Sequence, residues 1–404
     1  MRLIERREYV DWLKSYKDKQ VIKVVTGLRR VGKSTIFDLY ISDLMQNGIT
    51  DEQILKINFE DLKYERLRDK RALYEFVIAH ITSGKTLYVF LDEIQRVEGF
   101  EEVVDSLFIQ ENVDVYITGS NAKFMSSEIA TLLTGRYVEI NVLPISFKEY
   151  YNHFKSEGKS RREMFNDYIT YGALPGLFMF ETGSSQQREY IESVYKTILE
   201  KDILKRNSAA SKQLVENILS YLVYNIGCLT SVKRITDTLN SNGTKVSYNT
   251  VDSYFDTLLD SYFIYKADRY DVVGKEYLKL INKYYITDFG FKYYILNNKN
   301  LEIPQLLENL VFLELKRRRY KVATGKVDKR EVDFIVKDNL DKTKYVQVAV
   351  TVMDEDKLNQ ELKPFYDIAN NYPKYIITLD DYFVKDHDGV ITINAIDFLL
   401  GQEI

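Results

Sequence analysis

The sequence is poor in the residues that build disulfide frameworks and zinc sites. Its 404 residues include one cysteine and three histidines, Cys228, His80, His153 and His387. A single cysteine excludes a disulfide framework and is typical of a reducing compartment. No histidine lies near Cys228 in the sequence, which argues against a zinc site. The apolar stretch 226–229 predicts that the Cys228 thiol is buried.

Long apolar runs and a strong excess of one charge are also missing. The chain has no run of about eighteen apolar residues, the length that a membrane-spanning helix needs. The charged segment 1–8 lacks the apolar core of a secretory signal. We therefore expect a cytoplasmic protein with no membrane partner. The formal net charge of −4 is no signature of nucleic-acid binding, so such binding would need a local basic patch.

A phosphate-binding loop is the clearest motif that is present. Residues 27–34 read GLRRVGKS, match the pattern GxxxxGK[ST] and follow the strand-like apolar run 21–25. Two glycines let the loop curl so that backbone N–H groups face phosphate oxygens, and a helix starting near Lys33 adds its positive end. Lys33 would reach the β- and γ-phosphates, and the Ser34 hydroxyl would bind Mg²⁺. The motif thus predicts an ATP and Mg²⁺ site, with an ordinary strand-to-helix turn as the alternative, built from Gly27, Leu28, Arg29, Arg30, Val31, Gly32, Lys33, Ser34 and Thr35.

Two acidic residues follow a second apolar run. Residues 87–91 are continuously apolar, as in a central parallel strand, and the run ends in Asp92 and Glu93. Nucleotides bind at the carboxyl ends of such strands. Asp92 would hold Mg²⁺, and Glu93 would polarise the water that attacks the γ-phosphate. The alternative is a solvated helix N-terminus, where acidic residues are also favoured.

A third strand supplies polar residues at its end. Residues 113–117 alternate as a strand and lead into Thr118-Gly119-Ser120-Asn121. Ser120 would contact the nucleotide phosphate and Asn121 would orient the attacking water. Capping of the following helix explains the same two residues almost equally well.

These motifs resemble those of a known family. The loop, the stretches 87–95 (LYVFLDEIQ) and 115–151, and the later 171–177 (YGALPGL) are similar to prokaryotic AAA+-type ATPases that carry a C-terminal restriction-endonuclease-like domain. The resemblance covers nearly the whole chain. It implies that Lys33, Ser34, Asp92 and Glu93 are the Walker residues. It also places Ser120 or Asn121 at the position of the nucleotide sensor.

The resemblance also draws attention to Arg136, in the segment 134–137 (TGRY). Arg136 is the best candidate for a catalytic arginine that contacts nucleotide phosphate, in its own or in a neighbouring subunit. Loss of such an arginine typically costs about 10³ to 10⁵ in rate. Alternatively, Arg136 pairs with Glu139 or caps a helix. AAA+ kinship favours a ring, but the sequence leaves the choice between a monomer and a homo-oligomer open.

The middle of the chain predicts a lid and a winged helix-turn-helix. Residues 151–210 resemble the small helical lid of AAA+ ATPases, which couples nucleotide state to domain angle. Residues 211–295 contain three helical patterns and two strand-like runs, the order of a winged helix that inserts its third helix into the major groove. The exposed face of that third helix carries acids, which favours a protein-binding or structural role. Basic residues nearby keep DNA contact open as the alternative, namely Lys233, Arg234, Lys266 and Arg269.

Residues 296–404 resemble restriction-endonuclease-like domains. Glu308 on a helix and Asp333 on a strand match the first two acidic positions of those nucleases, which use them to bind Mg²⁺. Gln347-Val348-Ala349 stands where Glu-x-Lys is expected, and alanine supplies no lysine charge. We therefore expect a scaffold or binding domain without nuclease activity. The basic run 316–319 is either a contact surface or a helix end where cations are favoured.

The sequence as a whole predicts an α/β protein with four parts: a P-loop parallel-sheet ATPase domain (1–150), a helical lid (151–210), a winged helix (211–295) and a restriction-endonuclease-like α/β domain (296–404). The leading hypothesis is an ATPase that uses ATP, Mg²⁺ and lid movement as a molecular switch or remodeller. The second is an ATP-gated protein that binds nucleic acid in defence or DNA transactions. The third is an active Mg²⁺-dependent nuclease. A nucleic-acid or protein partner would bind through the winged-helix and C-terminal parts.

Overall fold

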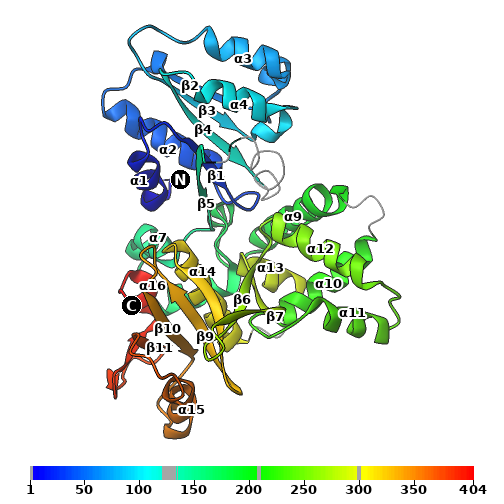
Figure 1. Ribbon diagram of the computed structural model, residues 1–404, viewed down its shortest axis with the longest axis vertical. Helices are drawn as coiled ribbons and strands as arrows, with labels where there is room; N and C mark the ends of the chain where they lie inside the picture. The colour runs from blue at the N-terminus through cyan, green and yellow to red at the C-terminus, as the bar shows by residue number, and fades with distance from the viewer. Residues whose placement is uncertain (1–2, 121–132, 134, 207–210, 298–301) are drawn as a thin grey trace. The chain divides into compact units, whose positions relative to one another are not determined.

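The chain forms two compact units. The computed structural model describes residues 3–120, 133, 135–206, 211–297 and 302–404. Unit 1 comprises residues 1–144 with 260–262, and unit 2 comprises residues 145–259 and 263–404 (Figure 1). The division at residue 144 lies close to the end expected for the nucleotide domain. Residues 151–404, which the sequence divides into three predicted parts, fall almost entirely in one unit.

Unit 1 is built on a parallel sheet. Its five strands pair in the order β2-β3-β4-β1-β5, and every pair is parallel. The strands are β1 (Ile22–Thr26), β2 (Ile54–Asn58), β3 (Leu87–Asp92), β4 (Val113–Gly119) and β5 (Tyr137–Asn141). The predicted α/β fold with the parallel sheet of a P-loop ATPase is confirmed. Because β4 lies between β1 and β3, the carboxyl ends of these three strands meet at one edge.

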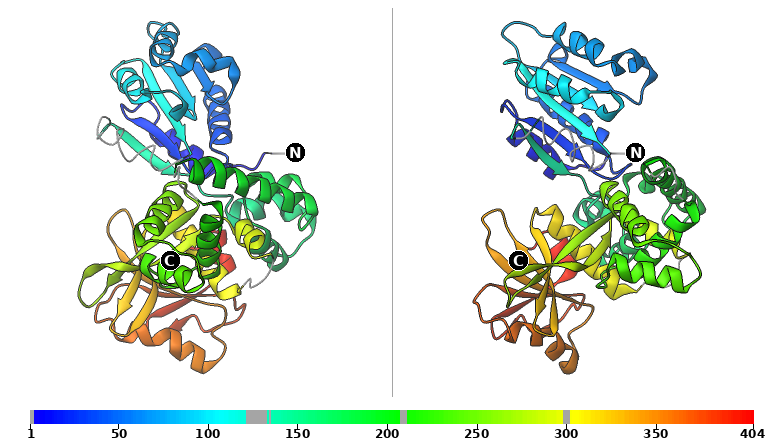
Figure 2. Two further views of the ribbon diagram at one scale, coloured as in Figure 1. Left: turned by 90° about the vertical axis from the view of Figure 1, so that its right-hand side faces the viewer. Right: turned by 45° about the vertical axis from the view of Figure 1, so that its right-hand side comes forward.

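Helices cover both faces of this sheet (Figures 1 and 2). On one face, α2 packs Phe37 and Tyr40 against Phe90 of β3, with ring centroids 5.1 and 6.1 Å apart. On the other face, residues of α3 and α4 share an apolar core with Val89 and Leu91, the neighbours of Phe90. Strand alternation therefore sends successive β3 side chains to opposite helical layers. The helices of unit 1 are α1 (Arg7–Ser15), α2 (Lys33–Gln46), α3 (Lys70–Ile78) and α4 (Phe100–Phe108), with short helices at Asp51–Gln53, Leu62–Arg68 and Ile94–Arg96.

Unit 2 begins with a helical region and has further helices between and after its strands. Its helices are α7 (Phe147–Phe154), α8 (Arg161–Tyr171), α9 (Ser185–Ile198), α10 (Lys212–Tyr224), α11 (Val232–Ser241), α12 (Tyr248–Asp260), α13 (Phe289–Ile295), α14 (Ile303–Arg317), α15 (Glu355–Tyr366) and α16 (Ala395–Leu400). Short helical turns lie at Lys155–Glu157, Pro175–Met179, Leu199–Ile203 and Leu204–Arg206. Among the helices that the structure describes, none has both the length and the apolar character to cross a membrane.

A mixed sheet of eight strands forms the rest of unit 2. The strands are β6 (Ile264–Asp271), β7 (Glu276–Ile286), β8 (Lys321–Val327), β9 (Arg330–Lys337), β10 (Thr343–Ala349), β11 (Lys374–Thr378), β12 (Asp386–His387) and β13 (Val390–Asn394). Their order is β12-β13-β11-β10-β9-β8-β6-β7. The hairpin β6–β7, predicted as the wing, pairs through β6 with β8, and so joins the sheet of the C-terminal region.

The motif at 171–177 is explained by packing in unit 2. Gly172 ends α8 with φ +94°, and a Cβ there would lie 2.2 Å from Oδ1 of Asp288. Asp288 is buried and accepts hydrogen bonds from the backbone N–H groups of Ala173 (2.7 Å) and Gly290 (2.9 Å). Burial raises the pKa of Asp288 to about 6, against the effect of these hydrogen bonds. A side chain at position 172 would displace the carboxyl group that joins α8 to α13.

Candidate ATP site

Two glycines shape the loop between β1 and α2. Gly27 has φ +141°, and a Cβ there would lie 2.4 Å from the carbonyl oxygen of Val142, so only glycine fits. Val142 in turn donates its N–H to the carbonyl of Thr26 (2.8 Å). Gly32 has φ +94° and precedes the first residue of α2, Lys33. The loop therefore turns sharply, and the positive end of the 14-residue helix α2 directly follows it.

Lys33 lies over this loop. Its side chain is buried, and Nζ donates to the carbonyl oxygens of Gly27 (3.1 Å) and Leu28 (3.4 Å). The same ammonium is 3.6 Å from Oε1 of Glu93. A buried cation this close to the loop backbone is well placed to meet the phosphates of a nucleotide.

Asp92 carries the atom that best fits a metal ion. It is fully buried at the end of β3, and its Oδ1 accepts a hydrogen bond from the Thr118 hydroxyl (2.6 Å). Burial raises the pKa of Asp92, and hydrogen bonds from Ser34 and Thr118 oppose that rise. Its Oδ2 is buried without a hydrogen-bond partner. A buried, unpartnered carboxylate oxygen beside a serine hydroxyl is the oxygen donor set that Mg²⁺ prefers, so Asp92 and Ser34 fit the ion.

Glu93 is held in an unusual backbone conformation. Its φ of +55° lies in the left-handed region, which is uncommon for a glutamate and costs backbone strain. Ser120 Oγ (3.2 Å) and Gln95 Nε2 (2.5 Å) both donate to Glu93 Oε2. Burial alone would raise the pKa of Glu93, but the Lys33 ammonium and the other nearby donors outweigh burial and lower it. Glu93 is therefore an ionised carboxylate, the form that accepts a proton or orients water.

Thr118 connects the two acids, a contact that its place in the polar run 118–121 did not predict. Its hydroxyl donates to Asp92 and accepts the backbone N–H of Glu93 (2.9 Å). The Ser120 side chain contacts Glu93, so the structure brings Ser120 to the predicted site. Asn121 lies outside the described residues. The place of Thr118 at the end of β4, between the loop strand and the acid strand, is the signal that could have found it.

The other residues of the predicted loop site differ in burial. Leu28 and Val31 are fully buried. Arg29 lies 3.8 Å from Glu60 and helps to lower the pKa of Glu93 through its charge. Arg30 is exposed with φ +70°, and Thr35 is half-buried in the first turn of α2.

Arg6 also holds the loop in place, and sequence reasoning missed it. This arginine is buried, and its guanidinium donates to the carbonyl oxygens of Val31 (3.1 Å) and Leu143 (2.7 Å). Tyr9 accepts the N–H of Leu143 on its hydroxyl (3.0 Å). The segment before α1 thus ties the loop to the chain that follows β5. A single arginine in a charged segment carries no sequence signal for this contact.

The structure places Arg136 away from the loop of its own chain. Arg136 precedes β5, and its carbonyl accepts the N–H of Ile22 (2.8 Å), the first residue of β1. The loop follows the opposite end of β1. The Arg136 guanidinium pairs with Asp105, not with Glu139 as one alternative held, because Glu139 accepts the Thr26 hydroxyl instead. In the structure Arg136 pairs with Asp105 instead of Glu139 and lies at the end of β1 opposite the loop; a phosphate contact in another copy stays a prediction.

The predicted nuclease residues lie in unit 2 and converge on a lysine. Glu308 and Asp333 each contact the ammonium of Lys283, at 2.9 and 3.2 Å. Gln347 accepts the backbone N–H of Asp333 on Oε1 (3.1 Å). Lys283 belongs to β7, more than sixty positions before Ala349, where the family pattern expects the lysine. Because Lys283 is so distant in the sequence, no local pattern links it to these acids.

Three residues of the basic run 316–319 make contacts within unit 2. Arg318 pairs with Glu314 (2.9 Å) and donates to the carbonyl of Gln402 (2.8 Å). Arg317 also faces Glu314, and Lys316 lies over the ring of Tyr265 with its Nζ 4.8 Å from the centroid.

The side chain of Cys228, which the apolar stretch 226–229 predicts to be buried, is exposed in the structure.

Comparison with known proteins agrees with the geometry of unit 1. A family described as an AAA domain matches residues 19–151, and a domain of unknown function matches residues 162–302. A Walker-type ATPase of Pyrococcus abyssi has a similar fold, with a TM-score of 0.53 and 17% identity over 72% of this chain and 96% of that one. Fold and loop thus define a P-loop protein with an AAA domain.

Two uncharacterized proteins are similar in sequence. One from Haemophilus influenzae is 35% identical over 401 residues, 98% of this chain and 99% of that protein. One from Methanocaldococcus jannaschii is 28% identical over 336 residues, 78% of this chain and 72% of that protein. The chain belongs to the same family as the Haemophilus protein.

Replacement of Arg136 tests its placement. We expect Arg136→Ala to bind ATP as tightly as the native chain, because the Asp105 pair lies at the other end of β1. Lys33→Ala should weaken ATP binding by at least about tenfold, since it removes a buried charge beside the phosphates. Titration with a fluorescent ATP analogue measures both. Loss of binding in Arg136→Ala at the level of Lys33→Ala would contradict the placement.

Proposed function

We propose that this protein hydrolyses ATP at the loop 27–34 and uses its nucleotide state as a molecular switch or remodeller. The observation that carries the proposal is the pair at the end of β3: a buried Asp92 oxygen without a partner, next to an ionised Glu93. A site that only bound nucleotide would not need a carboxylate held in strained backbone beside the loop.

Each residue has a task that follows from its contacts. Lys33 and the loop N–H groups would bind the phosphates, while Asp92 and Ser34 would hold Mg²⁺. When bound, Mg²⁺ supplies positive charge that offsets the charge on the phosphate oxygens. Glu93, oriented by Ser120, would align a water molecule and accept its proton. Thr118 keeps both acids in register because one hydroxyl contacts the two of them.

Replacement of Glu93 separates binding from hydrolysis. Glu93→Gln keeps the shape of the side chain but removes the proton acceptor, so steady-state phosphate release should fall by about 10² to 10⁴. ATP affinity should stay within about threefold, because Lys33 and the loop are intact. The control is Glu102→Gln on α4, whose partner is the exposed Lys70. Equal turnover in Glu93→Gln and Glu102→Gln would remove Glu93 from the mechanism.

The contacts of Lys33 suggest how binding begins the switch. Its ammonium already bonds two loop carbonyls and faces Glu93, and phosphate oxygens would compete for the same ammonium. Binding and hydrolysis therefore change the electrostatic partners of Glu93 and, through Ser120 and Thr118, those of the end of β4. We expect the two units to respond to this change.

Distance measurement tests the switch. In a Cys228→Ser background, the exposed positions Glu52 in unit 1 and Tyr382 in unit 2 are changed to cysteine and labelled for energy transfer. ATP and ADP should give different transfer efficiencies, and Glu93→Gln should keep the ATP value over time. Identical efficiencies in the ATP, ADP and nucleotide-free states would reject the switch and leave a plain ATPase.

A second candidate function, ATP-gated nucleic-acid binding, is favoured by one surface. A hollow on α11 is lined by hydroxyl groups and cations together with one acid, from Ser231, Lys233, Arg234, Asp237, Thr238 and Ser241. Hydroxyl groups and cations are the usual partners of a phosphate backbone. The exposed face of α12 carries Asp256 instead, so we place nucleic-acid contact on the second helix and not on the third.

Binding of a labelled DNA duplex decides this candidate. With ATP present, Arg234→Ala should weaken binding at least about fivefold and reduce its salt dependence, while Asp256→Ala should not weaken it. Anisotropy titrations at several salt concentrations give both values. Binding that is absent in the native chain, or equal in native and Arg234→Ala protein, excludes α11 as a nucleic-acid surface.

A further inference from the structure

A lysine in unit 2 is enclosed by three carboxylates. Lys283 is buried on β7, and its Nζ lies 2.9 Å from Glu308, 2.6 Å from Glu331 and 3.2 Å from Asp333. The three acids come from α14 and β9, which are far from β7 in the sequence. The ammonium therefore occupies the centre of the group, where all three acids converge.

The surrounding hydrogen bonds complete this arrangement. The Tyr285 hydroxyl donates to Oε1 of Glu308 (2.7 Å), the atom that Lys283 also contacts. Asp333 uses one oxygen for Lys283 and the other for the N–H of Val348 (2.9 Å). Gln347, at the position where an acid was expected, adds no charge and accepts the N–H of Asp333.

The ammonium stays charged at this place. Burial alone would lower the pKa of Lys283, but Glu308, Asp333 and Glu331 outweigh burial and raise it well above the usual value. Burial raises the pKa of Glu308 to about 7, against the effect of Lys283. The cluster is thus a cation held by three acids.

The donor set does not fit a metal ion. Glu308 and Asp333 match the positions at which the resemblance expects Mg²⁺ ligands, yet the described part of the chain has no group of three acidic, histidine or cysteine side chains arranged to hold a metal. The reason is visible in the distances: Lys283 is within hydrogen-bond reach of all three acids and fills the position between them.

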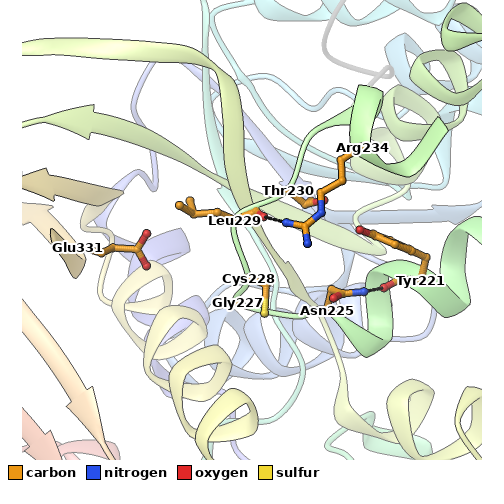
Figure 3. A pocket seen from close by; sticks show the side chains of 8 residues that line it. All are labelled: Tyr221, Asn225, Gly227, Cys228, Leu229, Thr230, Arg234 and Glu331. Carbon is orange, nitrogen blue, oxygen red and sulfur yellow. Dashed lines mark hydrogen bonds between the residues drawn. The ribbon is translucent and has the colours of Figure 1, made fainter. Parts of the chain in front are cut away.

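One acid of the cluster, Glu331, borders a pocket. Glu331 lines a pocket of about 500 Å³ together with residues from α10, α11 and the turn between them, as Figure 3 shows: Tyr221, Asn225, Gly227, Cys228, Leu229, Thr230 and Arg234. A Cβ at Gly227 would lie 3.1 Å from Glu308, so the wall of this pocket touches a second acid of the cluster. The pocket thus gives access to the acid Glu331 of the cluster.

We propose that the Lys283 ammonium replaces the divalent cation between Glu308, Glu331 and Asp333, so that unit 2 is a metal-independent module that does not cleave nucleic acid. The exchange has a structural effect as well. Because Lys283 comes from the hairpin β6–β7, the cluster fastens this hairpin to α14 and β9, a link that a metal bound only to the acids would not make.

The central test asks whether removal of the lysine creates a metal site. Two variants are titrated with Mn²⁺ in the absence of nucleotide: Asp92→Asn alone, which serves as the native cluster, and Asp92→Asn combined with Lys283→Met. The Asp92→Asn substitution removes the proposed metal ligand of the ATP site from both. Free Mn²⁺ is followed by electron paramagnetic resonance. Lys283→Met should bind one Mn²⁺ at least about tenfold more tightly than the native cluster, and Glu308→Gln added to it should abolish the gain.

The control is another buried lysine. Lys292 on α13 is buried and donates to Gln305 (2.9 Å), so Lys292→Met should gain no Mn²⁺ site. Lack of any gain in folded Lys283→Met would overturn the proposal. If that variant does not fold, the protein with Lys283 intact provides the test. Binding of one Mn²⁺ that is lost in Glu308→Gln or Asp333→Asn would overturn the proposal, and so would cleavage of a plasmid in the presence of Mn²⁺ and ATP.

Discussion

The site in unit 1 depends on one hydroxyl group. Thr118 Oγ donates to the Asp92 carboxylate and accepts the backbone N–H of Glu93, so it holds the proposed metal ligand and the proposed proton acceptor together. This contact exists because β4 lies between β1 and β3, which brings the ends of three strands to one edge. The loop, its lysine and both acids then converge at that edge. The order of the strands brings these residues together, which no single motif does alone.

The two units handle buried charge in opposite ways. In unit 1, Asp92 keeps one oxygen without a partner and so leaves room for a cation. In unit 2, a cation that belongs to the chain, Lys283, lies between the acids and offsets part of their charge. A buried carboxylate without a partner is costly, and retaining one is expected only where a ligand supplies the missing contact. On the two proposals, cation-dependent chemistry belongs to unit 1, and Lys283 holds elements of unit 2 together.

Local patterns in the sequence predict much of the candidate site. The remaining residues act through contacts between segments that are distant in the sequence, which local patterns do not reveal. The loop, the β3 run and its two acids follow from spacing and strand-end position, so they could be located from sequence. Arg136 precedes its strand, a position that in a parallel sheet lies opposite the loop of the same chain. Arg6 and Lys283 could not be found, because each acts through contacts with residues far away in the chain. The sheet that joins β6 to β8 was missed for the same reason.

The central claim is that the unpartnered oxygen of Asp92 is a Mg²⁺ ligand in an ATP-hydrolysing site. The most direct measurement is calorimetric titration of ATP into native protein and Asp92→Asn, each with and without Mg²⁺. The account predicts that Mg²⁺ strengthens ATP binding to the native chain and that Asp92→Asn loses this dependence while still binding ATP. An equal effect of Mg²⁺ on both proteins would contradict it.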